Sequence, residues 1–540
     1  MTQVSNVRIA GKRNLLSAQP ALLIYLLPLV LLKHPVLMLC VFAGLFMLHS
    51  AFEVARRNWR LEYAADPARA NSKRWLATIV ATVGLVMAVQ YAVLIPPVQS
   101  PDESAHIYRA YGLADNDFFV PKNSVENPFN QDVDEGLERF VQGWREKLAT
   151  KGDERVTPNL ASSMNSTSFK GREGRVWNAA AGYFPVLYWP AASGFALAMD
   201  ASQPVWVGNL WARTFMAIIA IIATALALMI SRAGTATIAA VSLLPMTLAQ
   251  YGSVNFDATT ISHGLLVVAL LTTSVFDTEN PEQIPRWART GCWLLFTVLI
   301  ISKPVYIALL LLPTAWIFFK HGNVWAKRPS LREVKNSRVE LLMVGAALLL
   351  LFGWVAHMSA NLVDLRIKDT VSIGARITQA VTSPVELFTI LGNTITENGR
   401  FYWESAIGIM GWLDTPLPRA FYFQATAFLL MAFVVDAIAV NGLPKKERLL
   451  LFISLVGYVV ALFLLFWASW TPRNGTFIEG IQGRYFIPVI PLLAYMIGRG
   501  SRDLKFLGLS PYWIMLVPVS VFTLVQLFTV PFTLLARYWL

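Results

Sequence analysis

The residues best suited to chemistry stand in the polar stretch of residues 100–111, SPDESAHIYRAY, which directly follows a long apolar run. Asp102, His106 and Arg109 are spaced by four and then three residues. In a helix this spacing puts a carboxylate, an imidazole and a guanidinium on one stripe. Such groups can move protons or hold anions. A solvated helix face could show the same stripe by chance, but polar structure that emerges from a membrane span favours a functional role.

The same stretch predicts how the helix begins. Ser100 fits the N-cap, Pro101 fits the first helical position, and Glu103 closes a capping box three residues after the cap. These three residues are therefore explained by local structure alone. Asp102 is not, and it is the first candidate for chemistry.

Three cations that map to one edge of the predicted spans are candidates for binding phosphate, because a charge at a membrane edge is costly and usually has a function. They are Arg213, Lys303 and Arg484. Arginine offers a two-pronged donor to a phosphate and lysine a point charge. The alternative is that their long side chains only snorkel to the interface and anchor the topology.

The neighbours of Arg484 add to its candidacy. Gln482 and Gly483 leave a polar, uncrowded approach to the backbone, and Tyr485 supplies a hydroxyl. Further candidates for the same site are His106, Arg109, Tyr188, Asn255, Asp257, Trp412 and Asp414.

Metal binding has little support in the sequence. His and Cys residues show no spacing typical of a metal site, so none is predicted. Carboxylate oxygens of Asp102, Glu103 and Asp257 could share a divalent cation, and this alternative stays open.

Composition defines the class of protein that must position these residues. Of the 540 residues 55% are hydrophobic and only 14% are charged, and the mean hydropathy is +0.51. Such a chain lacks the polar surface of a soluble protein, so we expect a multi-spanning membrane protein. The net charge of +12 comes from Lys and Arg between apolar runs, as the positive-inside rule predicts, so nucleic acid is excluded as a partner. Cys40 and Cys292 lie in apolar runs and form no disulfide framework.

The apolar runs predict an all-α polytopic fold with about 13 transmembrane helices, a cytoplasmic N-terminus and an external C-terminus. Residues 1–74 are expected to form an N-terminal hairpin and a cytoplasmic basic segment, although residues 19–50 could instead be one long helix. Residues 75–540 form the main transmembrane domain. Large external loops, residues 96–204 and 358–419, follow the third and ninth spans. The first loop has 14 acidic and 10 basic residues, a net charge of −4. The apolar segment 182–199 within it is expected to lie along the outer interface. Predicted spans are residues 19–32, 35–50, 75–95, 205–230, 235–251, 258–276, 289–302, 304–320, 339–357, 420–441, 449–469, 485–499 and 511–533.

Five motifs in a fixed order carry a family resemblance. They are PDESAHIYRAY at 101–111, SVNFDA at 253–258, SKPVY at 302–306, GWLDTPLP at 411–418 and IEGIQGRYFIP at 478–488. Together they resemble the DUF2142 family of bacterial integral-membrane proteins over most of the chain from residue 75. The order of one span, a large loop that opens with acidic residues, an aromatic-proline segment and an early arginine is similar to the C-type (GT-C) glycosyltransferases.

The GT-C resemblance implies an inverting glycosyltransferase of the bacterial inner membrane that works on its external, periplasmic face. Its partners would be a sugar donor carried on polyprenyl phosphate, a cell-surface glycan or lipid-linked acceptor, and membrane lipids, with no certain cofactor. An acidic residue of the first loop would be the catalytic base. We expect Asp102 in that role, with Glu103 as the second candidate. Arg484, Arg213, Lys303, Gln482 and Tyr485 would bind the donor phosphate.

The sequence departs from the GT-C pattern at two places, and two alternative functions remain. The segment at residues 183–188 has one proline where many relatives have two, and the N-terminal hairpin lies outside the shared core. A transporter or flippase of lipid-linked sugars is the main alternative, although it predicts inverted repeats and mid-membrane charges that the sequence does not display. A structural assembly subunit is the other alternative, and it leaves the five motifs without a role.

Overall fold

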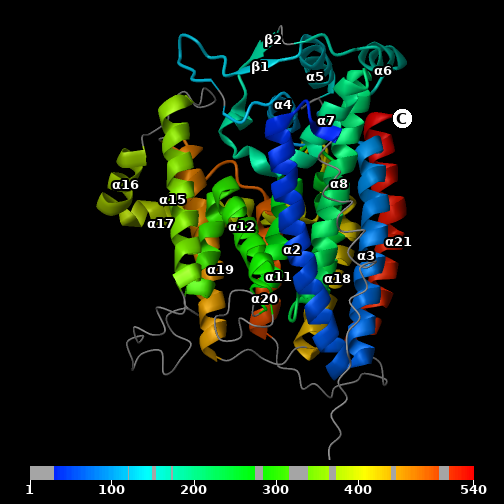
Figure 1. Ribbon diagram of the computed structural model, residues 1–540, viewed down its shortest axis with the longest axis vertical. Coiled ribbons are helices and arrows are strands. Elements are labelled where there is room, and N and C mark those ends of the chain that lie inside the picture. The colour runs from blue at the N-terminus through cyan, green and yellow to red at the C-terminus, as the bar shows by residue number, and fades with distance from the viewer. Residues whose placement is uncertain are drawn as a thin grey trace, which may run out of the picture.

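Helices dominate the computed structural model, which describes residues 30–119, 121–148, 154–171, 174–273, 284–314, 338–363, 373–439, 445–472, 474–497 and 510–540 (Figure 1). Within these ranges, seven helices have stretches long and apolar enough to cross a membrane. They are α2 (Pro35–Ala65), α3 (Pro67–Leu94), α8 (Val205–Ile230), α15 (Arg338–Asn361), α18 (Arg419–Ala439), α19 (Lys445–Ser469) and α21 (Pro511–Tyr538).

Several shorter elements lie among the long helices. They are α9 (Thr235–Ser242), α10 (Pro245–Tyr251), α11 (Phe256–Leu270), α12 (Arg286–Ser302), η7 (Pro304–Leu310), η8 (Gly483–Val489) and α20 (Ile490–Ile497). The all-α membrane class is thus confirmed, whereas the count of 13 spans stays a prediction. Most of the first predicted span, residues 19–32, lies outside the described residues. The predicted span 235–251 is broken into α9 and α10, because Pro245 starts a new helix.

The two long helices α2 and α3 form a hairpin whose turn is built from local signals. The Asp66 carboxylate accepts a hydrogen bond from the Arg69 N–H, and Pro67 occupies the first helical position. This turn carries six Lys and Arg residues within positions 56–74. We call this end of the molecule the basic face. The predicted span 75–95 therefore begins earlier, at Pro67.

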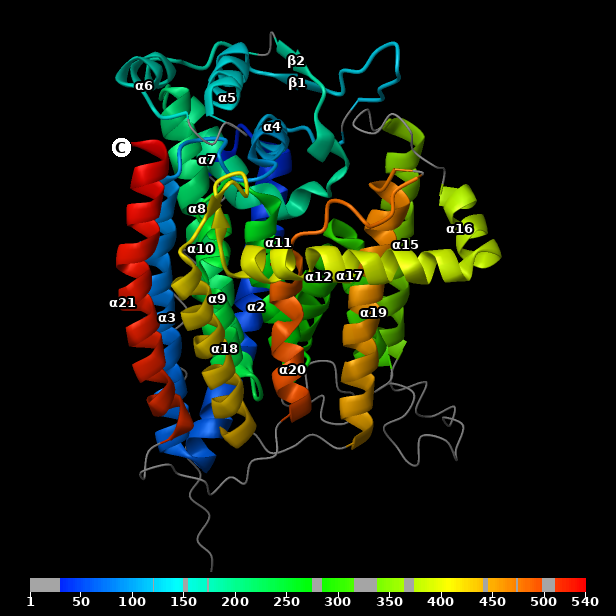
Figure 2. The same cartoon turned by 180° about the vertical axis from the view of Figure 1, so that it is seen from behind.

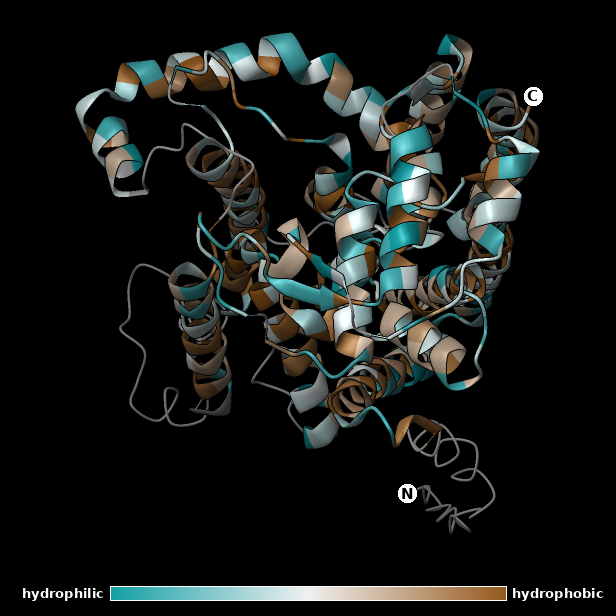
Figure 3. Ribbon diagram, turned by 90° about the horizontal axis from the view of Figure 1, so that it is seen from above, coloured by the Kyte–Doolittle hydropathy of each residue, from teal (hydrophilic) through white to brown (hydrophobic). Residues whose placement is uncertain are grey.

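The opposite end, which we call the loop face, carries the segment between α3 and α8 (Figures 1 and 2). Its elements are α4 (Glu103–Ala114), β1 (Gln131–Val133), α5 (Glu135–Leu148), α6 (Pro158–Asn165), β2 (Gly174–Val176), η3 (Ala179–Gly182), η4 (Pro185–Tyr188) and α7 (Trp189–Asp200). β1 and β2 pair antiparallel, with Gln131 opposite Val176. Hydrophilic residues gather on these elements, whereas the spans beneath are mainly hydrophobic (Figure 3).

Helix α7 differs from the interfacial helix predicted for residues 182–199. Ala191, Ala192 and Phe195 have no exposed surface, and a Cβ added at Gly194 would overlap the backbone of Ala212 in α8. Small residues let two helices approach closely in a membrane protein. The proline-interrupted, small-residue sequence therefore reflects tight packing on α8, whereas the position of α7 at the outer interface stays a prediction.

The second large segment also reaches the loop face. It contains α16 (Ile373–Thr382), α17 (Pro384–Ile407), β3 (Ile409–Met410) and β4 (Thr415–Pro416). Helix α17 runs across the direction of the spans (Figure 2). The end of the chain lies at the loop face too, where the Val156 N–H donates to the Tyr538 carbonyl at 2.8 Å. The first large segment and the C-terminus thus share the loop face, whereas α17 of the second segment lies closer to the middle of the molecule (Figure 2).

Candidate functional site

The start of α4 and the start of α11 are joined by hydrogen bonds. The Asn255 side chain caps α11 by accepting from the Asp257 N–H, and it donates to the Pro101 carbonyl at 2.7 Å. The Val254 N–H donates to the Glu103 carboxylate at 3.0 Å. Two motifs more than 150 residues apart in sequence are therefore one structural unit. Asn255 is a positioning residue in it.

Asp102 stands at the junction in an unusual backbone conformation. Its φ is 64°, in the left-handed region that non-glycine residues rarely adopt, and α4 begins one residue later, at Glu103. The prediction of a helix start capped by Ser100 was wrong in this respect, although half of the capping box is present because the Ser100 N–H donates to the Glu103 carboxylate. Backbone strain of this kind is often found at functional sites.

Four charged side chains meet at this junction, and we call them the charge cluster: Asp102, Asp257, Lys303 and Arg484. Asp257 accepts from Lys303 Nζ at 2.8 Å and from Arg484 Nε, and Arg484 Nη2 lies 3.6 Å from Asp102. Their side chains are 54% exposed for Asp102 but only 9% for Asp257, 15% for Lys303 and 2% for Arg484. Asp102 is thus the open member of a cluster whose formal charges cancel.

Tyr485 and Gln482 support the two cations. Lys303 Nζ lies 4.3 Å and Arg484 Cζ 5.2 Å from the centroid of the Tyr485 ring, within cation–π range. The Gln482 amide oxygen accepts a hydrogen bond from Arg484 Nη1. The structure therefore joins Arg484, Lys303, Gln482 and Tyr485 at one place, as the sequence predicted for a phosphate-binding group.

Gly483 does not leave a free approach for a ligand. A Cβ at this position would overlap the backbone of Tyr402 and Ala406 in α17, and the Gly483 N–H donates to Ser405 Oγ at 2.9 Å. The predicted open approach was therefore wrong. The missing side chain makes room for α17, which holds the loop before Arg484 in place.

Glu103 and Arg213 form a separate buried ion pair. Arg213 donates two hydrogen bonds to Glu103, at 2.9 and 2.8 Å, and its other N–H groups donate to the carbonyls of Ala92, Ile95 and Pro96. Their side chains are 0% and 2% exposed. All five guanidinium donors are used. This pair fixes α8 and α4 to the end of α3, and Arg213 thus does not join the other residues that were expected to bind phosphate.

His106 belongs to an aromatic wall beside the cluster, formed by His106, Tyr183, Tyr188 and Phe256. His106 Nδ1 lies 2.6 Å from the Tyr188 hydroxyl, and Phe256 stacks on Tyr188 with a centroid distance of 5.0 Å. Tyr183 packs on Phe256 at 4.9 Å and is 40% exposed. Burial lowers the pKa of His106 to about 4, against the opposing effect of the nearby Asp102, so the imidazole is neutral at neutral pH.

Arg109 is buried behind this wall. It donates to the carbonyls of Tyr183, Asp117 and Phe118, with the shortest bond, to Phe118, at 2.9 Å. Burial lowers its pKa to about 10, so it stays charged at neutral pH. Arg109 therefore positions Tyr183 and does not face an open site.

The second large segment contacts the same region through Trp412. Its indole N–H donates to the Val98 carbonyl at 2.7 Å, four residues before Asp102. Asp414 instead pairs with Arg537 of α21 at 3.2 Å. Trp412 therefore adjoins the segment that carries Asp102, whereas Asp414 fixes the C-terminal helix.

Three features of the site extend beyond the predicted residues. Tyr183 and Phe256 were not singled out, although Tyr183 opens the aromatic-proline segment at residues 183–188 and Phe256 stands in the SVNFDA motif, between Asn255 and Asp257. No motif around Arg537 indicated that its side chain would pair with Asp414. Within the described ranges, no group of three His, Cys, Asp or Glu side chains is arranged to hold a metal ion, and Glu103 turns to Arg213 and not to Asp257.

The fold and the site define a nearly all-helical, multi-spanning membrane protein with a charge cluster and an aromatic wall at one face. The chain belongs to the family described as "Predicted membrane protein (DUF2142)", whose model matches residues 85–493. This range contains all four residues of the charge cluster. No curated protein and no solved structure matches the chain.

Proposed function

We propose that this protein is a glycosyltransferase that moves a sugar from a polyprenyl-phosphate donor to a cell-surface glycan or lipid-linked acceptor. The loop face would be the external side of the bacterial inner membrane. The observation that carries the proposal is the charge cluster, in which a half-exposed carboxylate stands beside two cations at the end of the spans.

Asp102 is the proposed general base. The acceptor hydroxyl oxygen attacks the anomeric carbon, the bond from that carbon to the phosphate oxygen breaks, and Asp102 takes the hydroxyl proton. Its exposure of 54% lets an acceptor reach it, whereas Glu103 is fully buried and paired. The anomeric configuration inverts because the acceptor attacks opposite to the leaving phosphate.

Arg484 and Lys303 are the proposed partners of the donor phosphate. Negative charge grows on the phosphate oxygens as the bond breaks, and fixed cations stabilise it there. Asp257 holds both cations in place through its two oxygens. The 3.6 Å contact between Arg484 and Asp102 is the longest and therefore the weakest in the cluster. A phosphate can replace this contact with the smallest loss of stabilising interaction.

The aromatic wall supports a sugar as the transferred group. Tyr183 exposes 40% of its surface next to Phe256, and aromatic faces stack well on the apolar face of a pyranose. The wall adjoins the cluster because His106 follows Asp102 by one helical turn. A sugar on this wall would place its anomeric carbon near both the base and the cations.

A transfer assay in detergent tests the proposal. Purified protein is incubated with radiolabelled sugars on polyprenyl phosphate and with envelope glycan or glycolipid acceptors, and label in the acceptor is counted. Asp102→Asn should lower turnover at least about a hundredfold, the usual size of a general-base effect. Asp132→Asn is the matched control, because Asp132 is 44% exposed on the same loop and, among the described residues, forms an ion pair with Arg175 alone.

A flippase or transporter gives a different result. It moves label between the two sides of a vesicle and gives no covalent product in detergent. Label that crosses the membrane without reaching any acceptor would therefore overturn the proposal, as would full transfer by Asp102→Asn.

A further inference from the structure

A groove lies between α2, α3 and α8, near the basic face and apart from the charge cluster. Its volume is about 420 Å³, within the range of ligand pockets. Seven of its nine lining residues are apolar or aromatic, among them Phe52, Trp59 and Met229. Along α8 it extends from Ile222 to Met229, which is about 10 Å or a third of the hydrocarbon thickness.

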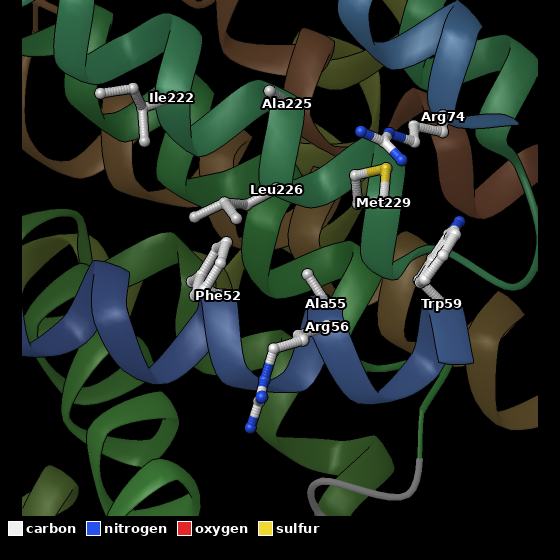
Figure 4. A pocket seen from close by; sticks show the side chains of 9 residues that line it. All are labelled: Phe52, Ala55, Arg56, Trp59, Arg74, Ile222, Ala225, Leu226 and Met229. Carbon is white, nitrogen blue, oxygen red and sulfur yellow. The ribbon is translucent and has the colours of Figure 1, made fainter. Parts of the chain in front are cut away.

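The groove is polar at one end only. Trp59, Met229 and Arg74 meet at the end toward the α2–α3 turn, whereas Phe52 and Ile222 line the other end (Figure 4). Phe52 is 53% and Ile222 41% exposed, so the end of the groove that these two residues line opens on the apolar surface of the spans. The groove therefore has the polarity of a lipid, with a charged end and an apolar end.

Arg74 is the cation available at the polar end. It extends toward Met229 (Figure 4), and its guanidinium lies 5.8 Å from the centroid of the Trp59 ring. Among the described residues it has no carboxylate partner, whereas Arg56, the other charged residue of the lining, is held by Glu53 and extends away from Arg74 (Figure 4). The Trp59 indole N–H likewise has no acceptor within the described part of the chain.

The charge around this end is positive. Residues 53–74 contain six Lys and Arg residues against three Asp and Glu residues. Glu53 and Glu62 pair with several of these cations, but the excess of +3 remains. Such a basic segment at a membrane surface attracts anionic lipid head groups.

We propose that this groove binds one anionic phospholipid of the membrane, with its phosphodiester on Arg74 and the first part of an acyl chain between α2 and α8. The Trp59 ring lies beside the glycerol region, where aromatic side chains are enriched in membrane proteins. The lipid fills the space between three spans and joins the hairpin to α8. This site is independent of the proposed glycosyl transfer.

Native mass spectrometry of the purified full-length protein tests this site. The protein is released from micelles that contain dioleoyl phosphatidylglycerol or dioleoyl phosphatidylcholine, and retained lipid is counted against lipid concentration. We expect retention of one phosphatidylglycerol with clear preference over phosphatidylcholine. Arg74→Gln should weaken this retention roughly fivefold, the effect of one surface cation on an anionic lipid. Arg60→Gln, at an exposed arginine of the same turn that does not line the groove, should weaken retention less than Arg74→Gln does, because it removes charge from the segment but no contact in the groove.

A second variant tests the acyl chain. Ala225→Phe fills the groove and should abolish retention of both lipids, and Ile222→Trp does the same from the lipid-facing side if Ala225→Phe fails to fold. The proposal is overturned if Arg74→Gln and the groove-filling variants retain phosphatidylglycerol like the unmodified protein. It is also overturned if inorganic phosphate raises the melting temperature as much as phosphatidylglycerol does, because the site would then bind only a free anion.

Discussion

Replacing Glu103 by glutamine gives the sharpest separation between the two neighbouring carboxylates. Glu103 accepts hydrogen bonds from Arg213, from the Val254 N–H and from the Ser100 N–H, and it has no exposed surface. Glu103→Gln keeps the shape but leaves the Arg213 charge buried without a counter-charge. Breaking a buried ion pair on one side costs about 3–5 kcal/mol. Asp102→Asn changes a half-exposed side chain and should cost no more than about 0.5 kcal/mol.

Thermal or denaturant-induced unfolding of both variants in the same micelles measures this difference. The double variant Glu103→Gln with Arg213→Gln removes both charges, so it should be more stable than the sum of the two single losses predicts. The size of that coupling gives the contribution of the ion pair. Turnover is measured on the folded fraction of each variant.

One result would contradict the assignment of Glu103 to a structural ion pair. If Glu103→Gln unfolds like the unmodified protein and has no activity, while Asp102→Asn keeps its turnover, Glu103 is the base. The buried ion pair would then have to open during the reaction.

Three further predictions follow from the site and the topology. Arg484→Lys should weaken transfer because the two-pronged donor is lost, and Arg484→Ala should weaken it further because the charge is lost as well. The loss appears in the donor KM if the phosphate is already bound in the ground state, and in kcat if the contact forms only as the bond breaks. Unchanged kinetics would remove Arg484 from the site. His106 has its folded-state pKa lowered to about 4, so its contribution to stability is present above pH 6.5 and is lost as the pH falls toward 4, by roughly 2 kcal/mol at pH 5. His106→Gln should reduce this loss between pH 7 and pH 5 in thermal unfolding, and an equal loss in both proteins would contradict it. Cysteines at Ser162 and Asn474, both exposed, should each react with an impermeant thiol reagent in intact cells when introduced into a cysteine-free background, and protection of only one would refute the shared external face.

All four residues of the charge cluster were among the site candidates named from the sequence, but their grouping was not predicted, because Arg213 was placed with the cations and Asp257 was only a further candidate. Asp102, Asp257, Lys303 and Arg484 stand in four separate motifs, each at the end of an apolar run. The predicted alternation of spans puts all four ends on one side of a membrane. The motifs mark the places where chain segments enter or leave the apolar layer. The predicted topology therefore gives the side of the membrane and the depth at which each of the four residues lies, whereas the contacts between them depend on how the helices pack.

The orientation of single side chains could not be predicted in the same way. His106 was expected on an open stripe with Asp102. Instead the helix starts at Glu103, two residues later than predicted, because Asp102 has a left-handed backbone, and His106 contacts the Tyr188 hydroxyl. Arg213 was grouped with Lys303 and Arg484, the cations expected to bind phosphate, because all three map to the same edge of the predicted spans. Its partner Glu103 and three backbone carbonyls are brought close only by the tertiary fold.

The short elements around the site had the weakest sequence signal. Helix α11 has 15 residues and α20 has 8, fewer than a straight span needs, so hydropathy alone could not distinguish spans from buried helices. In α7 the apolar run packs against other helices and not against lipid. Hydropathy reports that a segment avoids water, but it does not report what covers the segment.

The charge cluster favours Asp102 as the carboxylate that changes partners. Its formal charges sum to zero, so an incoming phosphate makes the cluster negative unless one carboxylate gives up its cation. Asp257 is held by both Lys303 and Arg484 and is 9% exposed, whereas Asp102 has one contact of 3.6 Å and is 54% exposed. Water can stabilise the displaced Asp102 but cannot reach Asp257 to the same extent. On the proposed function, donor binding therefore releases the carboxylate that an acceptor hydroxyl can reach and leaves Asp257 to hold the two cations on the phosphate.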